Sequence, residues 1–164
     1  MDWYPWVVLA HVIGAFGFIF AHGVSAFAAF RMRADPRPEN VTALVTLSST
    51  SFAVMYPSLL VLLVAGIVGG FMGDWWGRAW IWISIGLFVA VAVAMYYLGT
   101  RFYVRVRHAV GIAAPQDGKD APAPVPMSEA ELAALLASRR PELLALVGGG
   151  GLAVLVLLMV IKPG

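Results

Sequence analysis

Residues 52–72 read FAVMYPSLLVLLVAGIVGGFM and contain no aspartate, glutamate, lysine, arginine or histidine. A helix needs about 20 mostly apolar residues to cross a hydrocarbon core about 30 Å thick. The length and the composition of this stretch both satisfy that requirement. Residues 52–72 are therefore predicted to form a membrane-spanning helix.

Three further apolar stretches of similar length occupy residues 3–30, 79–98 and 143–161. The whole chain of 164 residues is 61% hydrophobic and 12% charged, whereas soluble domains carry about 25% charged residues. The pattern predicts an all-α fold, an integral membrane four-helix bundle that forms a single transmembrane domain over residues 1–164. The lipid bilayer is then its first partner.

The basic residues are divided unequally between the two sides of this predicted bundle. Nine of the eleven lie in the first and third connections or in the helical ends that adjoin them, and only Arg78 and Lys162 belong to the opposite side. Connections rich in lysine and arginine remain in the cytoplasm. We therefore expect both termini outside, in a multi-pass protein of the bacterial inner (cytoplasmic) membrane. Topology control explains these arginines, so no nucleic-acid partner is expected.

The third connection, residues 109–141, is predicted to lie in the cytoplasm and to contain two different parts. Residues 111–127 are rich in proline, alanine and glycine, which is typical of a flexible linker. Ser128 and Glu131 have the spacing of a capping box, which predicts a short amphipathic helix before the fourth span. Its apolar stripe is expected to rest on the membrane surface and consists of Leu132, Leu135 and Leu136.

Two features of the spans concern contacts with other molecules or helices. Gly66 and Gly70, and the run Gly148–Gly151, lack side chains that would hold a neighbouring helix away. Arg101, Arg105 and Arg107 extend the helical pattern of the third span. These arginines are interpreted either as a topology signal or as ligands for anionic lipid headgroups.

Two histidines, His11 and His22, are the clearly ionisable side chains at membrane depth. Successive helical residues turn by about 100°, so a separation of eleven residues returns to within about 20° of the same direction. Both rings therefore share one face of the first helix, about 16 Å apart along its axis. A polar side chain at this depth is expected to face the interior of the bundle.

Haem ligation is one interpretation of this face, because imidazole is a standard axial ligand and bundle interiors hold cofactors. His11 and His22 are the candidate ligands, and Met95 lies in the same half of the membrane as His22. The alternative is that each ring bonds a serine or a backbone carbonyl where two helices meet. Both interpretations stay open at this point.

Several kinds of chemistry are disfavoured by the residues that are missing. The chain has no cysteine, so it cannot form internal disulfides or thiolate metal sites. None of the four segments contains aspartate or glutamate, although ion and proton pathways usually contain buried carboxylates. We therefore assign no catalytic residue and no metal ligand.

Three short motifs resemble those of known membrane proteins. They are Leu9-Ala10-His11-Val12-Ile13-Gly14, Val64-Ala65-Gly66-Ile67 and Trp80. Their combination resembles the uncharacterised bacterial predicted integral membrane protein families and, more distantly, four-helix proteins of the CopD and HemJ type. The resemblance covers the first three helices and implies that His11 is a haem ligand. The HemJ type also carries an important third-helix lysine, and residues 79–98 contain none.

Two functions follow as expectations. The first is a non-catalytic accessory or assembly subunit, whose glycine faces pack within the bundle, against partner membrane subunits or in a homo-oligomer. The alternative is a b-type haem or porphyrin-binding membrane protein with a ligand on its first helix.

Overall fold

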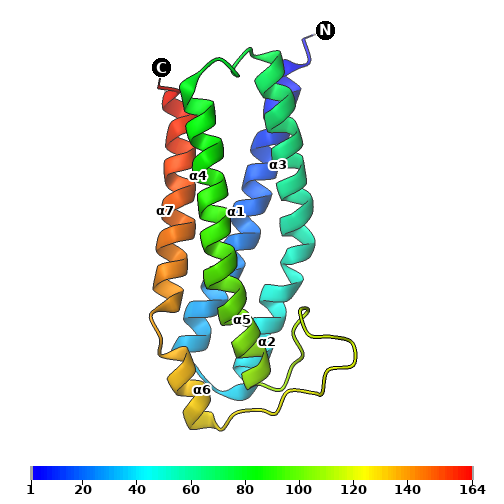
Figure 1. The fold of residues 1–164 in the computed structure, drawn as a ribbon, viewed down its shortest axis with the longest axis vertical. Helices are drawn as coiled ribbons and strands as arrows, with labels where there is room; N and C mark the ends of the chain where they lie inside the picture. The colour runs from blue at the N-terminus through cyan, green and yellow to red at the C-terminus, as the bar shows by residue number, and fades with distance from the viewer. Residues whose placement is uncertain (1, 164) are drawn as a thin grey trace.

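The computed structural model describes residues 2–163, and every regular element in that range is helical. The chain folds into a long rod of nearly parallel and antiparallel helices (Figure 1). The elements, in chain order, are α1 (Tyr4–Ala34), α2 (Pro38–Thr50), α3 (Phe52–Met72), α4 (Ala79–Met95), the π-helical turn η1 (Tyr96–Thr100), α5 (Arg101–Ala109), α6 (Glu129–Leu136) and α7 (Arg140–Ile161).

These elements form four runs that are long and apolar enough to cross a membrane, which confirms the predicted number of spans. Several helical runs extend beyond the predicted apolar stretches, and for the third run the pattern of Arg101, Arg105 and Arg107 indicated this extension. The first helix continues to Ala34, and the third continues through η1 and α5 to Ala109. The predicted connection 109–141 therefore holds α6 and the first two residues of α7 as well as irregular chain.

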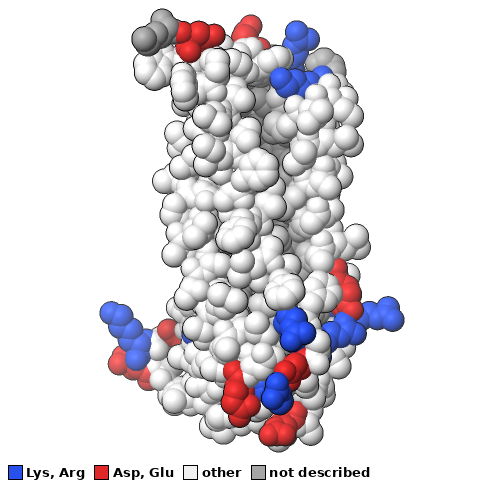
Figure 2. Space-filling view, turned by 180° about the vertical axis from the view of Figure 1, so that it is seen from behind, with Lys and Arg blue, Asp and Glu red and all other residues white. Residues whose placement is uncertain are grey.

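The two ends of the rod differ. Both termini and the turn at residues 73–78 lie at one end, called here the terminal end, and the connections 35–37 and 110–128 lie at the other, the linker end (Figure 1). Charged side chains gather at both ends, and an uncharged band separates them (Figure 2). Large apolar side chains point outward along this band, for example Phe16 and Phe20, about 70% exposed. A surface of this kind suits lipid rather than water, so the chain is a multi-pass membrane protein.

Helix α1 packs along α3, and α4 packs along α7. The first pair approaches closely because α1 carries glycine at the contact. A Cβ atom on Gly14 would stand 2.6 Å from the backbone nitrogen of Leu62. The second pair is in contact at Gly151, where a Cβ atom would collide with the side chain of Val91. Small residues thus set the distances between helices inside the membrane, as they commonly do.

The most completely buried apolar core lies at the linker end, outside the middle of the membrane band. It combines side chains from α1, α2, α5, α6 and the start of α7, among them Met32, Val41, Val45, Phe102, Val106, Leu132 and Leu136. The expectation that α6 rests on the membrane surface is therefore wrong. Its leucines fit against the apolar stripe of α5, which offers a surface inside the protein for them to cover.

The start of α6 follows the sequence prediction. Ser128 N–H donates to Glu131 Oε2 at 3.0 Å, and Glu131 N–H donates to Ser128 Oγ at 3.4 Å. This reciprocal pair is the capping box, and it satisfies backbone donors that the first helical turn leaves free. The prediction is confirmed because it depends only on the spacing of two nearby residues and not on the tertiary fold.

The connection between α5 and α6 is held at both of its ends. Near its start, Arg107 donates to the carbonyl of Ala113 through Nε at 2.9 Å and through a terminal nitrogen at 2.7 Å. Near its end, Met127 N–H donates to the carbonyl of Ala109 at 2.9 Å. Gly111 turns the chain back with φ +76°, a conformation that favours glycine. The expected flexible linker is thus tied to the end of α5.

Candidate functional site

His11 faces α3. Its Nδ1 lies 2.9 Å from the carbonyl oxygen of Leu62, and because a carbonyl only accepts, Nδ1 must donate. Gly66, one turn further along α3, makes room for the ring: a Cβ atom there would lie 3.0 Å from both Nδ1 and Cε1. In the tautomer that makes this bond, the ring carries its proton on Nδ1 and keeps an electron pair on Nε2.

His22 faces α7. A Cβ atom on Gly148 would lie 2.5 Å from its Nε2 and 3.3 Å from the methyl carbon of Met95. The ring of Phe18 stacks alongside at a centroid distance of 6.3 Å and an interplanar angle of 12°. Three helices, α1, α4 and α7, thus meet at Gly148, where α7 has no side chain. The structure brings together two of the three predicted site residues, His22 and Met95, and places His11 against a different helix.

At His22, Gly148 of α7 lies close to the atom through which the ring would bind iron. The position that a Cβ atom of residue 148 would take is 2.5 Å from Nε2. His11 is oriented differently: its Nδ1–H donates to a backbone carbonyl. Histidines that bind metals commonly make the same bond, which fixes the direction of the ring. No group of three or more histidine and acidic side chains in residues 2–163 is placed to hold a metal ion.

A network of hydroxyl groups joins α1, α2 and α5, and the sequence analysis missed it. Ser48 Oγ donates to Ser25 Oγ at 2.9 Å, and the hydroxyl of Tyr103 donates to the carbonyl of Ser25 at 2.5 Å. Ser51 Oγ lies 3.4 Å from Ser25 Oγ. The serine cluster at residues 48–51 and Ser25 on the histidine face were the available signals. The network contains no charged group, so it stabilises the packing of these helices rather than providing an acid or a base.

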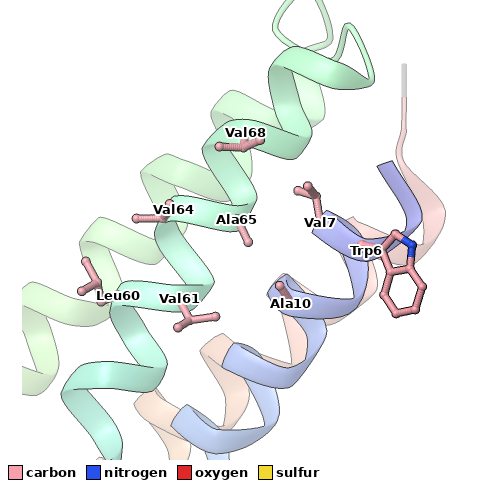
Figure 3. Close-up of a pocket in the computed structure, with 8 residues that line it drawn as sticks. All are labelled: Trp6, Val7, Ala10, Leu60, Val61, Val64, Ala65 and Val68. Carbon is pink, nitrogen blue, oxygen red and sulfur yellow. The ribbon is translucent and has the colours of Figure 1, made fainter. Parts of the chain in front are cut away.

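An open groove runs between α1 and α3 near the terminal end (Figure 3). It encloses about 500 Å³, and its lining is Trp6, Val7, Ala10, Leu60, Val61, Val64, Ala65 and Val68. Val7 and Ala10 lie opposite Val61 and Ala65, whereas Trp6 turns outward (Figure 3). The lining side chains carry no charge, so the groove suits an acyl chain or an apolar helix and offers no catalytic group.

Comparison with known proteins yields no relative: no family model, curated protein or solved structure matches this chain.

Proposed function

We propose that the chain is a non-catalytic accessory or assembly subunit of a membrane complex, and that α7 presents a docking surface to a partner helix. The observation that carries this proposal is the state of the four consecutive glycines in α7. Gly148 receives His22 and Gly151 receives Val91, whereas Gly149 and Gly150 are exposed and have nothing near the position of a Cβ atom.

Glycine in the middle of a helix is unfavourable by about 1 kcal/mol relative to alanine. Contacts within the chain account for Gly148 and Gly151, but they do not account for Gly149 and Gly150. A helix from another subunit, or from a second copy, could approach the backbone closely at these two positions. Around them the outward face of α7 is apolar, with Leu146 at 70% exposure, which suits a contact made within lipid.

Cysteine cross-linking tests this proposal, because the natural chain contains no cysteine. Gly149→Cys and Gly150→Cys place a single thiol on the open face of α7. Val89→Cys is the control: this residue of α4 is 53% exposed and lies near the depth of Gly151, whose open side is filled by Val91. We expect a benzophenone maleimide, attached to the single thiol and activated by light, to cross-link the two glycine variants to a neighbouring chain in native membranes and to leave the control monomeric. Equal cross-linking of all three, or of none, would contradict the proposal.

Haem or porphyrin binding is the second candidate, and His11 carries it. Its Nδ1–H bond to Leu62 leaves Nε2 as the ligand atom, and the resemblance to CopD and HemJ proteins points to the same residue. The test is a visible spectrum of the purified protein, oxidised and reduced, after expression with added haem. A Soret band that disappears in His11→Ala would support this candidate. A featureless spectrum of the unmodified protein would reject it.

We also propose that the linker end faces the cytoplasm of a bacterium and that the terminal end faces outward. The excess of lysine and arginine at the linker end supports this orientation. Gly77 and Gly118 lie in connections at opposite ends, and both have open space around them. A membrane-impermeant maleimide should label Gly77→Cys in intact cells and Gly118→Cys only after lysis. The reverse pattern would overturn the orientation.

A further inference from the structure

A basic pocket lies at the linker end, where α5 meets the start of α7. It encloses about 390 Å³ and is lined by Thr100, Arg101, Val104, Arg105 and Arg140. Arg101 and Arg105 are four residues apart and so lie on the same side of α5. Arg140, the first residue of α7, completes the lining from another helix.

The π-helical turn and a glycine place these arginines together. A π-turn contains an extra residue and changes the direction of everything that follows it. Here η1 comes immediately before Arg101. Within η1, Gly99 lies beside the side chain of Leu144, at 3.6 Å from the position of a Cβ atom. The beginning of α7 therefore packs on η1 and brings Arg140 toward α5.

No acidic side chain in residues 2–163 forms an ion pair with these three arginines. Other basic side chains at this end have partners: Arg33 pairs with Glu142, and Arg37 pairs with Asp35. Arg101 does lie over the ring of Tyr97, 5.7 Å from its centroid, which leaves its charge unneutralised. The pocket thus holds three positive charges that no described acidic side chain neutralises, so it can accept an anion from outside the described chain.

The depth of the pocket points to a membrane lipid. Tyr96 and Tyr97, exposed by 63% and 56%, come directly before it on the third span. Exposed tyrosines of this kind mark the boundary between hydrocarbon and headgroups. On the other helix, the apolar run of α7 begins at Leu143, three residues after Arg140. The arginines therefore lie at headgroup level on both helices.

We propose that this pocket binds the phosphate of an anionic phospholipid headgroup through Arg101, Arg105 and Arg140. Arginine forms paired hydrogen bonds with phosphate oxygens, and basic pockets between membrane helices bind such headgroups. A topology signal would require only charge, not a shared pocket. Arg107, although it belongs to the same basic segment, bonds Ser49 and Ala113 instead. The three arginines of the pocket are thus free to bind a ligand, whereas Arg107 holds the linker.

Native mass spectrometry of the full chain, exchanged into mixed phosphatidylglycerol and phosphatidylcholine, tests this proposal. The variant Arg105→Gln/Arg140→Gln removes two charges from the pocket. The control Arg31→Gln/Arg139→Gln removes two charges from the same end outside the pocket. Far-UV circular dichroism confirms that both variants remain folded. A third arm adds inorganic phosphate to protein in phosphatidylcholine alone.

We expect retained phosphatidylglycerol adducts in the natural protein and in the control. In the pocket variant the apparent affinity should fall by roughly fivefold for each arginine removed. Equal losses in the two variants, or no preference for phosphatidylglycerol over phosphatidylcholine, would overturn the proposal. Retention of inorganic phosphate, with no retention of phosphatidylglycerol, would overturn the lipid assignment and indicate a soluble phosphate ligand.

Discussion

The ring of His22 lies against the backbone of Gly148, with Nε2 only 2.5 Å from where a Cβ atom of residue 148 would stand. This contact joins the first span to the last, and Met95 of the third span borders the same point. A polar ring in the interior is therefore accommodated by the absence of a side chain on its neighbour. The pairing explains one glycine of the run in α7 through packing.

Gly148→Ala should destabilise the bundle, whereas Gly149→Ala should not. The new methyl group at residue 148 would overlap His22, and overpacking of this kind costs about 1–3 kcal/mol. At residue 149 the space is open, so alanine should stabilise the helix by about 0.5–1 kcal/mol. Thermal unfolding in detergent, followed by tryptophan fluorescence, measures both. Equal midpoints for the two variants would contradict this view of the contact.

His11 and Gly66 should be energetically coupled. His11→Ala removes the hydrogen bond to Leu62, and such bonds between membrane helices contribute about 0.6 kcal/mol on average. Gly66→Ala should be destabilising in the natural chain, because its methyl group would crowd the ring at 3.0 Å. In the His11→Ala background that penalty should disappear. A double-mutant cycle of unfolding free energies tests this, and strict additivity would show that the two residues do not interact.

Arg107→Lys should release the start of the linker. The planar guanidinium of Arg107 donates to Ala113 and to Ser49 at once, and a lysine ammonium lacks this fork. The expected result is faster tryptic cleavage at Lys119 within the linker. Arg139→Lys is the matched control, since Arg139 makes no side-chain bond to the linker in the described chain. Unchanged cleavage in Arg107→Lys would show that the linker is held by other contacts.

The linker should also loosen in acid. The N–H of Ala114 and the ring of His108 both hydrogen-bond to the Asp117 carboxylate, and they lower the pKa of that carboxyl below 3.8. Because this pKa is lowered, the ionised Asp117 carboxylate contributes its full stabilisation of the folded linker above pH 3.8. That stabilisation is lost as the pH falls through the folded-state pKa. Carbon NMR titration of the Asp117 carboxyl group measures this directly.

Asp117→Ala should reproduce the acid effect at neutral pH as faster cleavage at Lys119. Gln116→Ala is the control, because Gln116 is an exposed neighbour of Asp117 and does not adjoin the bond cut after Lys119. A titration of Asp117 at the ordinary carboxyl pKa, or equal cleavage of both variants, would rule out this role.

Local sequence was sufficient for the spans and for the start of α6. A span depends on about 20 apolar residues in succession, and the Ser128–Glu131 box depends on two residues three positions apart. The length of the third helical run was only partly foreseen. The π-helical turn at Tyr96–Thr100 was not predicted, because no local signal distinguishes it from an ordinary turn.

Tertiary packing decided which helix each functional side chain faces. Helical periodicity put His11 and His22 on one face of α1, but the contacts assign them to α3 and α7. It likewise grouped Arg107 with Arg101 and Arg105, whereas Arg140 replaces it in the basic pocket. The physical reason is that hydropathy and helical period act along one chain segment. Contacts between helices depend on where distant glycines let backbones approach.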